Sequence, residues 1–78
     1  MVIDVLQKYI DHKKLVHRIM EFEVVYNQDA YLFMNRETLN ELMKVFSFKW
    51  DSKINGTYYY GRRVYENENL KFGEVEIR

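Results

Sequence analysis

The chain combines a length of 78 residues with a complete lack of cysteine, and this limits how it can become stable. A domain of this size buries only about 60–65% of the surface that its unfolded chain exposes. Many such domains depend on disulfides, metals or a partner subunit. Disulfides are excluded here, which is compatible with a reducing compartment. We therefore expect a single compact domain over residues 1–78, stabilised by its own core or by a partner.

Aromatic residues supply much of the material for that core. The chain holds seven Tyr, five Phe and one Trp, and large rings bury much area with few residues. Apolar residues make up 47% of the chain and the formal net charge is zero, which argues against disorder. No secretion signal is visible, and no apolar run approaches the ~20 residues that cross a bilayer. We expect a cytoplasmic protein that does not bind membranes.

The first half of the chain shows a change of hydrophobic period. Apolar residues recur at helical spacing over residues 2–13, which predicts an amphipathic helix. Residues 16–26 alternate instead, which predicts a half-buried strand, and residues 31–34 predict a second strand. The short polar turn at 27–29 predicts that these two strands form an antiparallel hairpin.

The second half of the chain predicts one helix and three strands. Asn35 can cap a helix over residues 36–45 by accepting a hydrogen bond from its first turn. The Asn55-Gly56 pair predicts a hairpin turn, and Gly61 indicates a bulge or a close approach of backbones. Strands are predicted over residues 46–50, 57–66 and 74–77. The order α-β-β-α-β-β-β predicts an α+β fold, with two helices packed on a mostly antiparallel sheet.

Residue patterns for catalysis and metal binding are sparse. His12 and His17 are the only histidines, and their spacing matches no strong zinc pattern. Neither Ser47 nor Ser52 lies in a nucleophile elbow, and the three glycines form no phosphate-binding loop. A carboxylate pair remains conceivable among Glu66, Glu68, Glu74 and Glu76. We expect no enzyme, no metal, no cofactor and no small-molecule substrate.

The charge is distributed in blocks although it sums to zero. Residues 1–20 carry four basic and two acidic residues, whereas residues 21–43 carry one basic and five acidic residues. Residues 44–63 carry five basic residues and one acidic residue, and residues 64–78 carry two basic and four acidic residues. The most basic block, 44–63, also holds Trp50 and three consecutive tyrosines.

Aromatic and basic side chains together fit two kinds of partner. Such residues can stack bases and hold phosphates, but the RNA-recognition signature is missing and the domain is neutral. Tyr, Trp and Arg are also the residues enriched at hot spots of protein interfaces. Tyr59 must point away from Tyr58 and Tyr60, so it either packs beneath a helix or lies in a contact surface. The predicted partner-binding residues are Trp50, Tyr59, Arg62 and Arg63, with Lys49 and Lys53 at the rim.

Two stretches resemble a pattern of phage virion proteins. YLFMNRETLNEL (residues 31–42) is similar to their strand, cap and helix, and GRRVYENENL (residues 61–70) is similar to a later strand and polar turn. The chain as a whole resembles the short proteins encoded by bacteriophages and prophages of low-GC bacteria. The resemblance implies a role in binding a host or viral protein, sometimes to inhibit it. The predicted function is thus protein binding without catalysis; a nucleic-acid-binding module and a homo-oligomeric virion or structural component are the alternatives.

Overall fold

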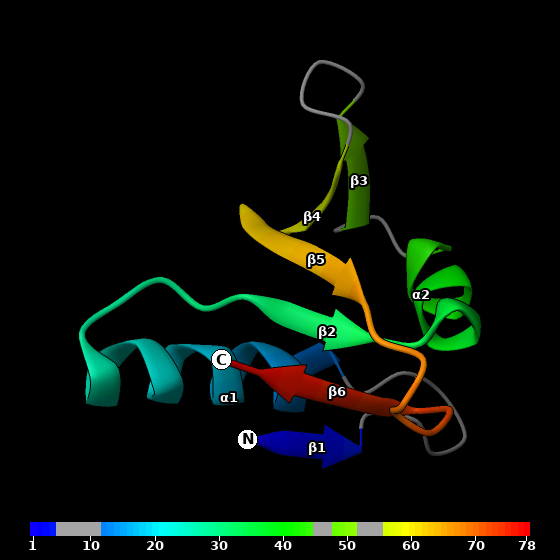
Figure 1. Ribbon diagram of the computed structural model, residues 1–78. Coiled ribbons are helices and arrows are strands. Elements are labelled where there is room, and N and C mark those ends of the chain that lie inside the picture. Colours follow the sequence, from blue (N-terminus) through cyan, green and yellow to red (C-terminus); the bar gives the residue numbers. More distant parts are fainter. Residues whose placement is uncertain (5–11, 45–47, 52–55) are drawn as a thin grey trace.

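The computed structural model describes residues 1–4, 12–44, 48–51 and 56–78, with side chains at all of these except 12 and 48–51 (Figure 1). In chain order the elements are β1 (Val2–Asp4), α1 (His12–Tyr26), β2 (Leu32–Met34), α2 (Arg36–Met43), β3 (Phe48–Asp51), β4 (Gly56–Tyr59), β5 (Arg62–Glu66) and β6 (Glu74–Ile77). The predicted α+β class, with two helices and a mostly antiparallel sheet, is confirmed. Neither of these two helices has the length and apolar character needed to span a membrane.

The strands form one sheet in the order β1-β6-β2-β5-β4-β3. Neighbouring strands pair antiparallel except for β2 and β5, which run parallel with Leu32 opposite Val64. The connection between these two central strands passes through α2, β3 and β4. The last strand, β6, lies between β1 and β2, so the two ends of the chain are neighbours in the sheet (Figure 1).

One face of the sheet carries the hydrophobic core. Alternate residues of β2, β5 and β6, such as Leu32, Val64 and Val75, are buried on it. Both helices pack on this face, because both contribute side chains to the same buried cluster. The helical members of that cluster are Leu15, Ile19, Phe22 and Leu42. Within the described parts of the chain, no helix covers the opposite face, which we call the open face.

The structure corrects the first two predicted elements. Val2–Asp4 is a strand that pairs with β6, and the rest of the helix predicted over 2–13 lies mainly outside the described residues. Residues 16–26 belong to α1 and not to a strand. The buried stripe Leu15, Ile19 and Phe22 has helical spacing, whereas Val24, Val25 and Tyr26 are exposed. The predicted hairpin with residues 31–34 is therefore wrong as well.

The second half follows the prediction more closely. Asn35 caps α2, since its Oδ1 accepts a hydrogen bond from the Thr38 N–H at 2.8 Å. β2, β3 and β6 form within or beside their predicted ranges; residues 45–47 and the predicted turn residue Asn55 lie outside the described part. The long strand predicted over 57–66 is divided in two. Tyr60 and Gly61, with φ of 48° and 79°, form a two-residue hairpin turn and not a bulge.

Candidate functional site: the open face of the sheet

Aromatic rings from β2, from the residue before it and from β5 meet on the open face. The Phe33 ring on β2 stacks against the Tyr65 ring on β5, with centroids 5.4 Å apart and an interplanar angle of 22°. Tyr31, which precedes β2, places its centroid 6.2 Å from that of Tyr65. Residues two apart on a strand share a face, so Tyr31 and Phe33 point to the same side. The parallel register sets Phe33 opposite Tyr65, which brings the rings together.

Two arginines lie over these rings. The Arg63 Cζ is 5.0 Å from the Tyr65 centroid and 5.6 Å from the Tyr58 centroid. The Arg78 Cζ is 4.0 Å from the Phe33 centroid, and its Nε donates to the Glu76 carboxylate at 3.2 Å. Guanidinium groups over aromatic faces gain cation–π energy while remaining able to donate hydrogen bonds. The open face is thus an aromatic platform with two positive charges.

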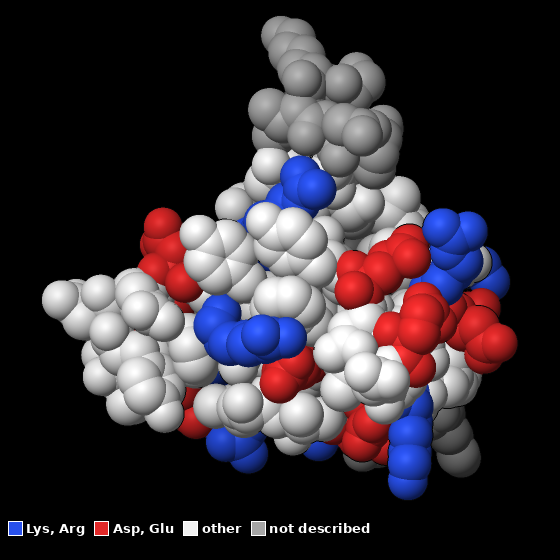
Figure 2. All heavy atoms as spheres, in the orientation of Figure 1, with Lys and Arg blue, Asp and Glu red and all other residues white. Residues whose placement is uncertain are grey.

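This platform is accessible to a partner. Tyr31 is 48% exposed and Tyr65 is 42% exposed, whereas Phe33, Tyr58 and Arg63 are partly buried. Figure 2 shows basic side chains in blue beside white surface over β2, β5 and β6, with acidic side chains in red on the same face. A hollow of about 340 Å³ adjoins the platform between the β4–β5 turn and residues 29–31. The open face therefore presents to a partner both exposed aromatic rings and a neighbouring hollow.

Gly56 leaves the space that the Arg63 guanidinium occupies. A Cβ atom added at Gly56 would lie 1.6 Å from the Arg63 Nη1 and 2.2 Å from its Cζ. The guanidinium therefore fills the space above Gly56, held also by the Tyr58 and Tyr65 rings. Because the side chain is confined before any partner binds, binding costs it less conformational entropy.

Arg62 lies on the other face of β5 and has a different role. Its Nε and Nη2 donate to the Glu23 carboxylate of α1 at 3.0 and 2.5 Å. Glu23 also accepts a hydrogen bond from the Ala30 N–H at 2.9 Å. The Arg62 hydrogen bond lowers the pKa of Glu23, and the same bond raises the pKa of Arg62. Arg62 and Arg63 therefore lie on opposite faces of the sheet, and Arg62 links β5 to α1.

Tyr59 is not a contact residue, because it is fully buried in the core. In one continuous strand, Tyr59 would share a face with Arg63 and Tyr65. The two-residue turn reverses the chain and sets Tyr59 opposite Arg62, so Tyr59 instead shares the helix-covered face with Val64. Burial raises the pKa of Tyr59 to about 12, and the neighbouring Tyr60 adds to this rise. Of the two placements weighed for Tyr59, packing beneath a helix is the correct one.

Two of the remaining predicted contacts, Lys49 and Trp50, lie on β3 at the edge of the sheet. In the backbone register, Lys49 pairs with Tyr58 and Trp50 with Thr57; the side chains of these two β3 residues, and all of Lys53, lie outside the described part. Sequence reasoning missed Tyr31, Phe33, Tyr65 and Arg78. The i, i+2 spacing of Tyr31 and Phe33 is a strand signal, but only the pairing of β2 with β5 and β6 shows that these residues meet.

In the part of the chain that the structure describes, no three His, Asp or Glu side chains come together as metal ligands. Comparison with protein-family models, with curated proteins and with solved structures finds no match to this chain.

Proposed function

We propose that this chain is a non-catalytic binding protein that holds a protein partner on its open face. The observation that carries the proposal is the platform formed by Phe33, Tyr65, Arg63 and Arg78 on the face of the sheet opposite both helices. Tyr and Arg in partly enclosed positions are typical of interface hot spots. The lack of cysteine fits a reducing compartment such as the cytoplasm.

The charges on the open face favour a protein over a nucleic acid. Arg78 is paired with Glu76, which lies opposite Phe33 in the register. Glu74 and Asp4 lie opposite each other on the same side of the sheet. Nucleic acids bind through phosphate neutralisation and need a predominantly positive surface. Alternating arginines and carboxylates instead match the mixed charges of a protein surface.

The proposal predicts a specific loss of partner capture when Arg63 is changed. Immobilised wild-type chain and the variant Arg63→Glu are compared for the proteins that they retain from a lysate of the encoding organism. We expect Arg63→Glu to lose a specific partner at least tenfold, because the guanidinium is replaced by a carboxylate beside the rings. Gly56→Ala should weaken capture in the same direction, since its Cβ displaces the same guanidinium without removing it.

Phe72→Ser provides the matched control. Phe72 is an exposed ring in the segment before β6, and its loss should leave capture unchanged. Melting temperatures of all variants separate loss of binding from loss of folding. Equal capture by the wild type and by folded Arg63→Glu would contradict the proposal. Nuclease-sensitive retention that falls steeply with salt would instead support the nucleic-acid alternative. Inhibition of a host protein, which the resemblance to phage proteins implies, stays a prediction.

A further inference from the structure

At β1 the sheet ends with backbone groups that point outward. β1 is the first strand in the sheet order, and in the described part of the chain it pairs with β6 alone. The backbone nitrogen of Met1 donates to the Ile77 carbonyl at 3.1 Å, and the Ile77 N–H donates to the Met1 carbonyl at 2.7 Å. Successive residues of an antiparallel strand direct these groups alternately to opposite sides. The N–H and C=O groups of Val2 and Asp4 therefore point away from β6.

Such an edge is a template for one more strand, because its outward groups can pair with another chain. A second copy of β1, antiparallel about a two-fold axis at Ile3, would set Val2 of each copy opposite Asp4 of the other. In both of these pairs, the Val2 N–H would donate to the Asp4 carbonyl and the Asp4 N–H to the Val2 carbonyl. The edge of β1 is thus complementary to itself, and the Asp4 carbonyl is an acceptor in each pair.

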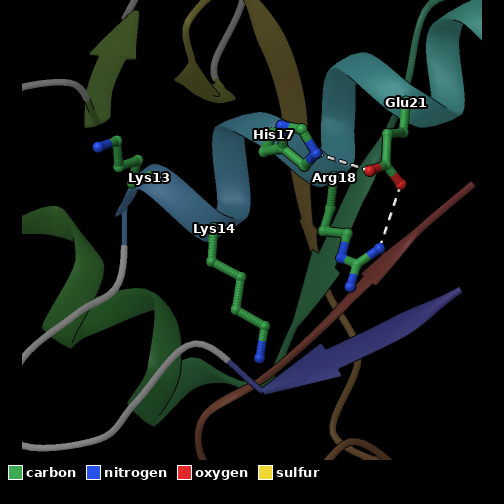
Figure 3. A pocket seen from close by; sticks show the side chains of 5 residues that line it. All are labelled: Lys13, Lys14, His17, Arg18 and Glu21. Atoms are coloured by element: carbon green, nitrogen blue, oxygen red, sulfur yellow. Dashed lines mark hydrogen bonds and ion pairs between the residues drawn. The ribbon is translucent and has the colours of Figure 1, made fainter.

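This carbonyl is already occupied by a lysine of α1. The Lys14 Nζ donates to the Asp4 carbonyl oxygen at 2.9 Å, so an ammonium group lies where the N–H of an added strand would have to donate. Figure 3 shows Lys14 extending from α1 towards the end of β1, whereas Lys13 points away from that strand. Lys14 is accordingly half-buried and Lys13 is exposed. Lysines are a common protection of sheet edges.

We propose that Lys14 closes the β1 edge to strand addition, and that loss of its ammonium group allows two copies of the chain to pair through β1. An added strand has to displace this charged group from the Asp4 carbonyl, once on each copy. The inference does not depend on the proposed function, because strand addition uses backbone groups of β1 and none of the rings or arginines of the platform.

Lys14→Met tests the proposal, because it removes the ammonium group and keeps a long unbranched side chain. Sedimentation equilibrium over a dilution series should show a mass that rises from 9.7 kDa towards twice that value. We expect Lys14→Met to associate at about one tenth of the concentration that the wild type requires, or at less. A tenfold change corresponds to the net gain of one or two hydrogen bonds, and two Asp4 carbonyls are released.

Lys13→Met is the matched control. It makes the same substitution at the neighbouring position of the helix and adds the same apolar group, but Lys13 points away from β1. It should therefore associate no more strongly than the wild type. Equal association in Lys13→Met and Lys14→Met would show that added apolar surface, and not release of the edge, causes the pairing, and would overturn the proposal.

Val2→Pro, introduced together with Lys14→Met, tests the strand register. The Val2 N–H points away from β6, so proline removes a donor of the added strand without removing a hydrogen bond to β6. The double variant, with retention of Met1 checked by mass spectrometry, should return to the association of the wild type. A dimer of Lys14→Met that Val2→Pro does not disperse would contradict pairing through β1.

Circular dichroism and melting temperatures of all variants separate association from misfolding. If Lys14→Met does not fold, Lys14→Gln, which also removes the charge, takes its place and is held to the same outcomes. A folded variant without the ammonium group that associates no more than the wild type over the whole dilution series would overturn the proposal. A structural contact between α1 and β1 alone would change the melting temperature and leave the mass unchanged.

Discussion

Replacement of Tyr59 by alanine is expected to lower the free energy of unfolding by about 3–5 kcal/mol, the loss typical of a fully buried ring. Among the side chains that the structure describes, Tyr59 is the largest that is fully buried, and its removal leaves a cavity between β4 and the helices. Since domains of this kind are stable by only about 5–15 kcal/mol, the variant should be close to unfolding at room temperature. Urea denaturation followed by circular dichroism measures the loss.

Tyr65→Ala is the matched control, because it removes the same ring from the open face. It should cost about 1 kcal/mol, since a partly exposed ring loses less burial and leaves no closed cavity. Equal losses in the two variants would show that Tyr59 is not enclosed as described.

The Tyr59 phenol should also titrate separately from other tyrosines. Burial raises its pKa to about 12, so the folded state disfavours the phenolate. The corresponding stability is complete below the unfolded pKa of about 10 and is lost as pH rises through about 12. Absorbance at 295 nm should therefore rise by the same amount near pH 10 in the wild type and in Tyr59→Phe, and only the wild type should show the additional rise of Tyr59 near pH 12. A larger rise near pH 10 in the wild type than in folded Tyr59→Phe would contradict this.

Glu23→Ala is expected to lower the free energy of unfolding by about 2–4 kcal/mol, because it leaves a partly buried guanidinium without its carboxylate. The Glu23 side chain is 17% exposed and that of Arg62 is 31% exposed, so water compensates only part of the loss. The Ala30 N–H loses its acceptor as well. Glu21→Ala is the control: its ion pairs with His17 and Arg18 are exposed and should contribute less than about 1 kcal/mol.

The Glu23 pair also predicts the response to acid. The Arg62 hydrogen bond lowers the pKa of Glu23 below its ordinary value of 4.5, so the folded state binds this proton less readily than the unfolded state. The stability that the pair adds is complete above about pH 4.5 and is lost as pH falls through the folded pKa. Denaturation midpoints measured between pH 7 and 3 should fall less steeply in Glu23→Ala than in the wild type. Parallel curves would show that another group controls the acid response.

The predictions from sequence succeeded where local signals and the fold agree. Asn35 followed by helically spaced leucines predicts α2, and the alternation of residues 74–77 predicts β6; in both cases neighbouring residues determine the structure. The predictions failed at α1, because Val24 and Val25 on its exposed side are β-branched residues, which are typical of strands. They failed at β1, because Val2–Asp4 is held by pairing with a strand from the other end of the chain.

The candidate site was predicted only in part, because it also depends on a turn and on strand pairings that local sequence signals indicate weakly. Arg63 lies on the open face, as a contact residue should, but the prediction for Tyr59 depended on one uninterrupted strand. A tyrosine at positive φ is an unusual turn residue, so the Tyr60-Gly61 turn carries a weak sequence signal. The platform itself joins β2 to β5 and β6, and such long-range pairing is not encoded in any local pattern.

The position of β6 has a consequence for synthesis of the protein on the ribosome. β1 is attached to the sheet through β6, and β6 also supplies the second neighbour of β2. The pairing of these strands is therefore complete only after residues 74–77 have left the exit tunnel. Until then, β1 and one edge of β2 present unpaired backbone groups to other nascent chains.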